Sequence, residues 1–367
     1  MPAMENFNPL RDAVPLGEVR RALVIKLRHH GDVLLSSPVF SALKAAAPHV
    51  EIDALVYADT AEMLTLNPAI RNVHVIDRAW KRQGVGHQLK QELSLLNALR
   101  NAQYDLVLHL TEHWRGAWLC RLLRPRWSVG CTRVDAGRAW HRSFSHLYKV
   151  SGGLPRHTVE RNLDALRRIG VRPPLADRTL QLVPGVDAET RVRQYLTDVG
   201  VSGPFIHIHP ASRWFFKCWP AERMAALVST LQAQGHQVVL TAAPSRDELV
   251  MVDAIQASLT KPVPSLAGQL SLKELAALTG MAQAFVGVDS APMHIAAAMG
   301  VPAVALFGPS GEKQWGPWSV QARVVASESH LCRPCGNDGC GGGKVSDCLE
   351  NLPVTQVMAA LQDVLQA

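Results

Sequence analysis

Short hydrophobic runs alternate with amphipathic segments from about residue 21 onward, and this alternation limits the fold more than any other feature of the sequence. Ala22–Leu27 and Phe205–His209 have the length and aliphatic content of buried strands. Strands that alternate with helices in this way form parallel sheets covered by helices. We expect further strands at 51–57, 72–76, 105–110, 237–241, 284–288 and 303–306, and helices over 89–101 and from about 220, 246, 271 and 292. The expected fold class is therefore α/β, with doubly wound sheets.

The chain is too long for one ordinary core. Its 367 residues suit two domains, and the proline-rich stretch from Val171 to Gly185 fits a linker between them. We expect an N-terminal extension (1–20), a Rossmann-like domain (21–175), a second Rossmann-like domain (176–345), and a C-terminal helix (346–367) that packs back across the domains. Ligands of such sheets bind at the carboxyl ends of the strands, so the function should lie in the loops there, around a central cleft.

Composition excludes several classes of protein. The chain is 47% hydrophobic and 19% charged, which is typical of a folded globular protein and not of a disordered one. No apolar stretch approaches the roughly 18 residues that span a bilayer. The first twenty residues lack a basic start and an apolar core, so we expect a cytoplasmic protein. The net charge of +7 favours an anionic partner, although a basic solvated surface explains it equally well.

The first candidate site follows the first expected strand, where the chain reads Lys-Leu-Arg-His-His-Gly-Asp over 26–32. Gly31 permits a tight turn, and a carboxylate held there, that of Asp32, can act as a general base. The alternative is an Asx turn or a helix cap. The pattern GxGxxG does not follow this strand, which argues against a dinucleotide-dependent oxidoreductase.

Two further candidates lie in the second domain. The loop over 210–220 places Ser212, Arg213, Lys217 and aromatic residues between a strand and a helix, which suits a phosphate clamp or, equally, a surface loop. Asp289 ends another strand and is followed directly by a helix. Free N–H groups of Ser290 and Ala291 at that helix start can bind a pyrophosphate while Asp289 accepts sugar hydroxyls. The alternative is that Asp289 caps the helix and His294 packs within it.

Taken together, the three segments resemble glycosyltransferase family 9, the bacterial heptosyltransferases that build the inner core of lipopolysaccharide. The likeness covers nearly the whole chain from about Ala22, and 24–35 and 212–220 look most like the members that transfer a third heptose onto the second. The resemblance implies a GT-B fold, with two Rossmann-like domains facing a central cleft. It also implies ADP-heptose as the donor, bound mainly by the second domain, and the lipid A-core oligosaccharide as the acceptor, bound mainly by the first.

The resemblance also implies roles for particular residues. Asp32 matches the catalytic base, Lys217 the lysine on the donor phosphate, and Asp289 the aspartate on the donor heptose. Ser-Ala replaces the family's Thr-Gly at 290–291, which keeps the N–H groups and leaves less room. Leu270 lies where relatives contact adenine, and the ribose partner stays open among Ser245, Asp247 and Glu248. The implied donor site is Ser212, Lys217, Leu270, Asp289, Ser290, Ala291 and His294; cations expected to meet the anionic acceptor are Arg28, His29, His30, Arg115 and Arg121.

The expected reaction is a single inverting displacement. Asp32 takes the proton of the acceptor hydroxyl, and ADP leaves with its charge stabilised by Lys217. No two aspartates are spaced as Asp-x-Asp, so we expect a metal-independent enzyme with no cofactor beyond its donor substrate. Because the acceptor is a lipid, we expect the enzyme at the cytoplasmic face of the inner membrane, in peripheral contact with it.

Four cysteines fall in a short glycine-rich segment. Four thiolates suit a structural zinc ion, but the second pair is spaced Cys-x7-Cys rather than Cys-x2-Cys, which favours reduced thiols over a zinc site. The total of seven cysteines argues against a disulfide framework in the cytosol. The cysteines of the segment are Cys332, Cys335, Cys340 and Cys348.

Three alternatives stay open. One is a family 9 transferase with another heptose acceptor or another nucleotide sugar. The second is a zinc-stabilised nucleic-acid-binding protein, against which the basic residues form no single stripe interleaved with aromatic residues. The third is a non-catalytic nucleotide-binding relative, which the presence of both Asp32 and Asp289 disfavours. We therefore expect no nucleic-acid partner.

Overall fold

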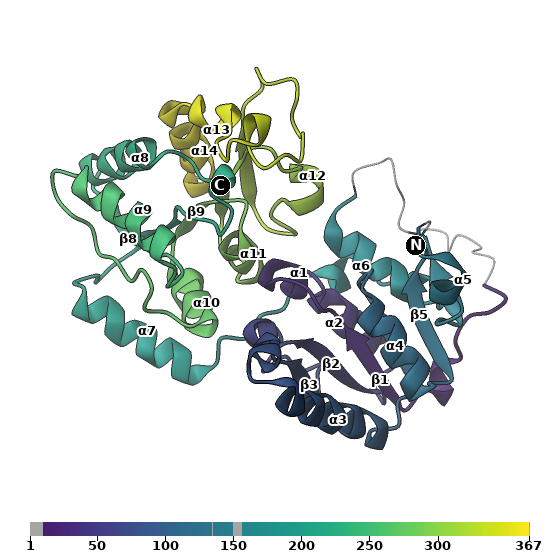
Figure 1. Cartoon of the computed structure of the whole chain (residues 1–367). Helices are drawn as coiled ribbons and strands as arrows, with labels where there is room; N and C mark the ends of the chain where they lie inside the picture. The colour runs from purple at the N-terminus through teal and green to yellow at the C-terminus, as the bar shows by residue number, and fades with distance from the viewer. Residues whose placement is uncertain (1–9, 134, 150–155, 367) are drawn as a thin grey trace, which may run out of the picture. The chain divides into compact units, whose positions relative to one another are not determined.

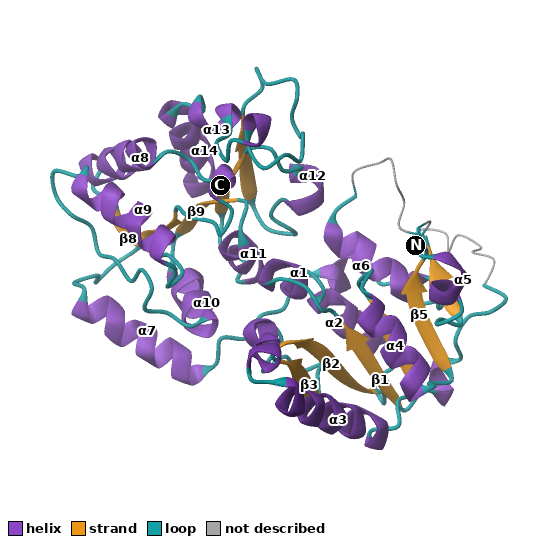
Figure 2. Cartoon of the chain, viewed as in Figure 1, coloured by secondary structure: helices purple, strands orange, loops and turns teal. Residues whose placement is uncertain are grey.

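The structure, a computed structural model, describes residues 10–133, 135–149 and 156–366. The chain divides into two compact α/β units (Figure 1). Unit 1 comprises Met1–Leu154 and Thr158–Thr179, and unit 2 comprises Pro155–His157 and Leu180–Ala367. Figure 2 shows strands at the centre of each unit with helices around them. The main boundary therefore falls at 179/180, a few residues beyond the predicted 175/176.

Unit 1 contains a six-stranded sheet in the order β3-β2-β1-β4-β5-β6, in which all paired strands are parallel. This is the strand order of a Rossmann fold, as the sequence predicts. Its strands are β1 (Arg21–Ile25), β2 (Glu51–Tyr57), β3 (Asn72–Ile76), β4 (Leu106–His109), β5 (Trp127–Cys131) and β6 (His146–Tyr148). Its α-helices are α1 (His30–Leu34), α2 (Ser37–Ala46), α3 (Val85–Asn101), α4 (Trp114–Leu123), α5 (Gly137–His141) and α6 (Thr158–Arg167), and its short 3-10 turns are η1 (Leu16–Glu18), η2 (Ala58–Met63), η3 (Arg78–Arg82) and η4 (Leu175–Arg178).

Unit 2 contains a five-stranded parallel sheet in the order β11-β10-β9-β7-β8. Its strands are β7 (Phe205–His209), β8 (Gln237–Leu240), β9 (Ala284–Val288), β10 (Ala303–Phe307) and β11 (Ala322–Ala326). Its helices are α7 (Val186–Asp198), α8 (Ala221–Ala233), α9 (Arg246–Ala257), α10 (Leu272–Met281), α11 (Ala291–Ala298), α12 (Glu312–Trp315), α13 (Asp347–Glu350) and α14 (Val354–Gln366), with 3-10 turns η5 (Phe215–Lys217) and η6 (Cys340–Gly342).

Strand β10 shows why unit 2 needs helices on both faces of its sheet. Val304 and Leu306 belong to a cluster with residues of α8, α9 and α14, whereas Ala305 and Phe307 belong to another cluster with residues of α11. Successive side chains of a strand point to opposite faces, so an uninterrupted apolar run must be covered on both. None of the described helices has the length and apolar character that crossing a membrane requires.

The C-terminal helix belongs to unit 2. Helix α14 packs against α8 and against the strands β9, β10 and β11. Val357 and Leu361 are fully buried in the cluster that these elements form. The predicted separate segment over 346–367 is thus, as far as residue 366, part of the second Rossmann-like unit.

The eight strands that the sequence predicts are present, and three further strands are not evident from the pattern. β5 contains serine, glycine and cysteine, β6 has three residues, and β11 is an edge strand with exposed side chains. Such strands lack the aliphatic run that marks a buried central strand. Helix α10 begins with a capping box formed by Ser271 and Glu274. At the start of α2, Ser36 is the N-cap and Ser37 is already inside the helix.

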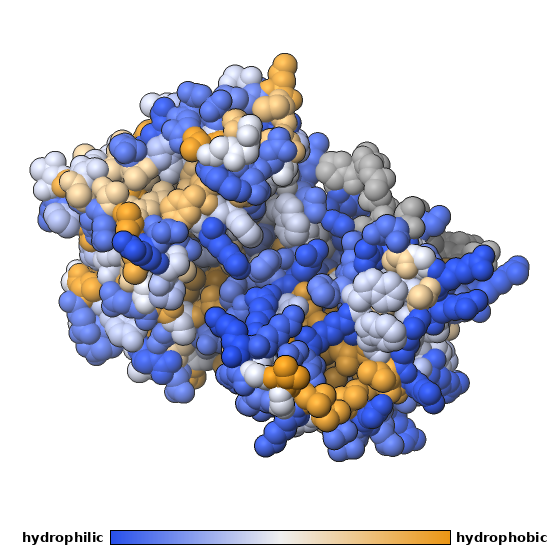
Figure 3. Space-filling model, viewed as in Figure 1, coloured by the Kyte–Doolittle hydropathy of each residue, from blue (hydrophilic) through white to orange (hydrophobic). Residues whose placement is uncertain are grey.

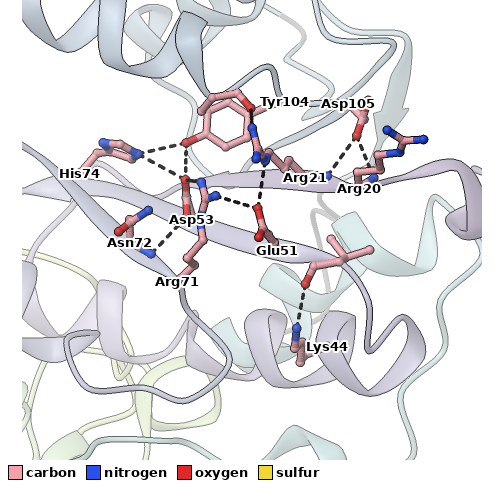
Figure 4. A network of polar contacts seen from close by, with 12 residues as sticks. Arg20, Arg21, Lys44, Glu51, Asp53, Arg71, Asn72, His74, Tyr104 and Asp105 are labelled. Atoms are coloured by element: carbon pink, nitrogen blue, oxygen red, sulfur yellow. Dashed lines mark hydrogen bonds and ion pairs between the residues drawn. The ribbon is translucent and has the colours of Figure 1, made fainter.

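A network of polar contacts joins β2, β3 and the start of β4 in unit 1 (Figure 4). The side chain of Asp53 on β2 is 1% exposed. Its carboxylate accepts two hydrogen bonds from the guanidinium of Arg71, at 3.0 and 2.7 Å, and one of 2.6 Å from the hydroxyl of Tyr104. The backbone N–H of Asn72 and the ring of His74 complete its surroundings. A buried charge is tolerated because every oxygen has partners.

These partners also control the ionisation of Asp53. Burial acts to raise the pKa of its carboxyl group, but the hydrogen bonds from His74, Arg71 and Tyr104 outweigh burial and hold the pKa well below its usual value. Because the folded-state pKa lies below the unfolded-state value of about 4, Asp53 stabilises the fold above that pH, and the contribution is lost as the pH falls below it.

We predict that Asp53→Asn lowers the free energy of unfolding by about 3 kcal/mol, because it leaves Arg71 without its buried counter-charge. Urea unfolding at pH 7 measures this change. The matched control is Asp59→Asn, which breaks the exposed ion pair with Arg78 and should cost less than about 1 kcal/mol. Equal costs for the two variants would contradict this role for Asp53.

Candidate active site

The strand order of unit 2 reverses at β7. From β7 the chain moves to β8 on one side and later to β9 on the other, so the loops that follow β7 and β9 lie on either side of the reversal. Ligands of open parallel sheets bind at such a point, outside the carboxyl ends of the strands. The second and third candidate segments of the sequence are these two loops.

An ion pair connects the two loops. The ammonium nitrogen of Lys217, in η5 after β7, lies 2.6 Å from a carboxylate oxygen of Asp289, the residue directly after β9. The side chain of Asp289 is 7% exposed and that of Lys217 is 22% exposed. The structure thus brings together two residues that are 72 positions apart and that the sequence assigns to one donor site.

Helix α11 begins immediately beside this pair. Ser290 is its N-cap, and the Ser290 hydroxyl bonds the carbonyl of Val288 rather than the first turn of the helix. The carboxylate of Asp289 therefore pairs with Lys217 and does not cap the helix. Ser290 and Ala291 are half-buried, which leaves the positive end of the helix accessible to an anion, whereas His294 is buried within the helix.

The loop that carries Lys217 is anchored to the C-terminal part of unit 2. The hydroxyl of Ser346 donates a 2.6 Å hydrogen bond to the carbonyl of Phe216, and the indole N–H of Trp219 donates to the carbonyl of Leu352 at 3.1 Å. Ser212 is buried, and its hydroxyl accepts a hydrogen bond from the backbone N–H of Trp214 at 3.3 Å. Ser212 thus shapes the loop, and Lys217 supplies its charge.

The other predicted donor contacts lie in two places: the three ribose candidates follow β8, and Leu270 precedes α10. Leu270 is half-buried and packs against the cluster formed by α7 and α10. Glu248 is buried, and its carboxylate accepts the backbone N–H of Ala243 at 2.9 Å. The carboxylate of Glu248 is thus already bonded within the fold. The other two ribose candidates, Ser245 and Asp247, are exposed at the start of α9.

Two histidines on β7 lie beneath the candidate site. His207 and His209 are buried and share the hydroxyl of Thr241, at 2.7 and 2.9 Å, and Thr279 bonds the other nitrogen of His207 at 3.1 Å. Burial lowers the pKa of His209 to about 4 and that of His207 well below its usual value. Both rings are therefore neutral at pH 7, which suits a structural role.

Unit 1 has an equivalent reversal between β1 and β4, where Asp32 lies. Asp32 is half-buried in the first turn of α1, which has His29 as its N-cap. The neighbouring strand β4 ends at His109, which is buried and bonds the carbonyl of His113 at 3.0 Å. Burial lowers the pKa of His109 to about 3, so this ring is neutral as well.

Lys26, which the sequence-based prediction does not single out, lies at the end of β1 close to Asp32. It is 4% exposed, and its ammonium group donates to the amide oxygen of Asn162 at 2.9 Å and to the carbonyl of Leu110 at 3.3 Å. Burial lowers the pKa of Lys26 to about 8, and the charge of Asp32 acts against that shift. One feature of the sequence could have identified Lys26, namely that it directly follows a run of aliphatic residues that are buried.

The predicted acceptor cations divide into two groups. Arg28 and His29 are exposed beside Asp32, and His30 bonds the carbonyl of Asp59 at 2.9 Å. The structure places Arg115 and Arg121 on α4, where each already has a partner. Arg115 pairs with Glu92 of α3, and Arg121 bonds Ser143 and the carbonyl of Ala139.

The four-cysteine segment follows β11 in the structure. Cys348 is buried, whereas the other three cysteines are exposed, and all four are free thiols. Within the described ranges, no three side chains of His, Cys, Asp or Glu gather in a geometry that holds a metal. Burial raises the pKa of the Cys348 thiol, which favours the protonated form.

Comparison with known proteins identifies the class to which this fold and site belong. The profile of glycosyltransferase family 9 (heptosyltransferase) matches residues 92–345. Lipopolysaccharide heptosyltransferase 3 of Escherichia coli strain K12 is 39% identical over 295 residues, which cover 80% of this chain and 84% of that protein. The chain therefore belongs to glycosyltransferase family 9. This membership sets aside the nucleic-acid-binding alternative.

Solved structures of the family share the fold. A family 9 glycosyl transferase from Veillonella parvula superposes with a TM-score of 0.82 at 22% identity, covering 97% of this chain and 99% of that one. The ADP-heptose lipopolysaccharide heptosyltransferase II of E. coli gives 0.75 at 23% identity, covering 94% and 98%. The predicted GT-B fold is confirmed.

We predict that the neutral histidines beneath the site make the fold sensitive to mild acid. Their folded-state pKa values lie below the unfolded value of about 6.5, so the unfolded chain binds more protons, and stability falls as the pH drops from about 6.5 towards 4. Each histidine contributes at most about 1.4 kcal/mol per pH unit. Urea unfolding at pH 7.5, 6 and 5 should show a smaller decline in His209→Asn than in the unaltered protein. Equal declines would assign the effect to other groups.

Proposed function

We propose that this protein transfers L-glycero-D-manno-heptose from ADP-heptose to the second heptose of the lipopolysaccharide inner core. The observation that carries the proposal is the ion pair of Lys217 and Asp289 beside the start of α11, at the strand-order reversal of unit 2. One cation, one carboxylate and a helix N-terminus suit a ligand that joins a pyrophosphate to a sugar. The likeness to E. coli heptosyltransferase 3 supports both the donor and the acceptor.

In this proposal the bound donor separates Lys217 from Asp289 and contacts each of them. The pyrophosphate takes the ammonium group of Lys217 and the N–H groups at Ser290 and Ala291, and Asp289 then accepts hydrogen bonds from heptose hydroxyls. The acceptor oxygen attacks the anomeric carbon, and the bond from that carbon to the phosphate oxygen breaks. ADP leaves with the bonding electron pair, and Lys217 and the helix start stabilise the charge that develops on it.

Asp32 receives the proton that the acceptor hydroxyl loses. A carboxylate in the first turn of a helix, half-buried at the end of β1, is suited to act as a general base. Lys26 is a positioning residue in this account, because its buried ammonium group balances the negative charge of Asp32. The exposed Arg28 and His29 beside the base are placed to meet the phosphates and carboxylates of the acceptor.

The proposal includes no divalent ion and no cofactor, since the sequence lacks Asp-x-Asp and the basic residues above supply the charge that a metal provides in other glycosyltransferases. It also places the enzyme at the cytoplasmic face of the inner membrane, because the acceptor is anchored there by its lipid. Contact with that membrane is expected to be peripheral.

We predict that Asp32→Asn abolishes transfer while ADP still binds. The assay incubates a lipopolysaccharide core that ends at the second heptose with ADP-heptose and EDTA, and mass spectrometry detects the gain of one heptose. The amide cannot accept the proton, so the expected loss is at least about 100-fold. The matched control is Asp253→Asn, at an exposed position on α9. Near-normal transfer by Asp32→Asn would remove this residue from the mechanism.

We predict that Lys217→Met weakens ADP binding by about 10- to 100-fold, the loss expected for one charge-assisted hydrogen bond. Calorimetric titration with ADP measures this change. Lys217→Arg should retain most of the affinity, and Lys261→Met, at an exposed lysine of the same unit, should retain all of it. Unaltered affinity in Lys217→Met would place the phosphates elsewhere.

A further inference from the structure

An apolar surface is exposed on helices α3 and α4 of unit 1. Figure 3 shows hydrophobic side chains gathered over these two helices. Val85 is 84% exposed, Leu89 57% and Trp118 53%, values far above those of core residues. We call this surface the α3–α4 face; its large apolar side chains are Val85, Leu89, Leu93, Trp118 and Leu122.

The apolar side chains of the α3–α4 face belong to the two helices and not to the loops beside them. Of the 17 residues of α3, all of them described, Leu99 alone is buried. Val85, Leu89 and Leu93 follow one another at intervals of four, so they lie along one side of the helix. The ion pair of Glu92 and Arg115 joins α3 to α4. An ordinary surface helix turns its apolar side to the core, and α3 leaves much of it in solvent.

Cations surround this face. Between residues 78 and 126 the chain has nine lysines and arginines and three aspartates and glutamates. Lys81 and Arg82 immediately precede α3, Lys90 lies within it, and Arg124 directly follows α4; all four are exposed. No carboxylate in the described part of the chain forms an ion pair with any of the four. The guanidinium of Arg121 also lies over the ring of Trp118, 5.1 Å from its centre.

We propose that the α3–α4 face docks unit 1 on an anionic lipid bilayer. The inference rests on the proposed function in one respect, which is that the acceptor is a lipid. Leucine and tryptophan side chains enter the boundary between headgroups and acyl chains, and the surrounding cations meet the lipid phosphates. A second copy of the chain is a poorer partner, because a two-fold contact through this face would bring the same cations together.

Vesicle sedimentation tests the docking directly. The full chain should bind vesicles of phosphatidylethanolamine and phosphatidylglycerol at least tenfold more tightly than vesicles of phosphatidylcholine. The variants Leu89→Ser/Leu93→Ser and Lys81→Glu/Arg82→Glu should each lose at least tenfold of that binding. The matched control, Val186→Ser/Val250→Ser, removes two exposed apolar side chains of unit 2 and should bind as the unaltered protein does.

A transfer assay separates this inference from the proposed function. The α3–α4 variants should transfer heptose normally to a deacylated, water-soluble acceptor and at least tenfold more slowly to the same acceptor embedded in vesicles. If the unaltered protein transfers heptose to neither acceptor, the proposed function fails. Vesicle sedimentation still tests in that case whether the α3–α4 face binds the bilayer. Binding that ignores lipid charge, or variants that sediment like the unaltered protein, would overturn the inference. A third outcome would also overturn it: the protein binds no vesicles, and light scattering shows a dimer that Leu89→Ser/Leu93→Ser converts to a monomer.

Discussion

The candidate donor site depends on one ion pair, that of Lys217 with Asp289. A carboxylate that is 7% exposed needs a counter-charge, and the fold supplies it from a loop 72 residues away. This requires β7 and β9 to be neighbours in the sheet, which the strand order provides. It also requires the Lys217 loop to be held in place, which the hydrogen bonds of Ser346 and Trp219 provide. In the proposal, a phosphate replaces Asp289 as the partner of Lys217, and sugar hydroxyls replace Lys217 as the partner of Asp289.

Unit 1 repeats this architecture. Its strand order also reverses beside the first strand, and again a lysine and an aspartate gather there. In this unit the lysine, Lys26, is buried and bonded to Asn162 and Leu110, so it is part of the framework, whereas Asp32 is half-buried. The proposal thus gives acceptor activation to unit 1 and donor binding to unit 2.

Central strands and the residues at their ends could be predicted from the sequence, because a strand covered on both faces is a continuous aliphatic run and its carboxyl end is a loop. The strands β6 and β11 could not be predicted, because β6 has only three residues and β11 has exposed side chains, so neither carries that pattern. The ion pair between Lys217 and Asp289 was not predictable as a contact, because a tertiary contact between distant loops leaves no local signal. For the same reason, the partners of Arg115 and Arg121 could not be predicted. Because these two arginines already have partners, they are weaker acceptor candidates than the exposed Arg28.

The most direct test of the central claim compares the affinities of ADP and ADP-heptose in Asp289→Asn by calorimetric titration. If Lys217 holds the phosphates and Asp289 holds the sugar, the variant should bind ADP-heptose about tenfold more weakly or worse. It should bind ADP at least as tightly as the unaltered protein, because a negative charge beside the phosphates is removed and Lys217 is released from it. An equal loss of affinity for both ligands, or no loss for either, would contradict the account.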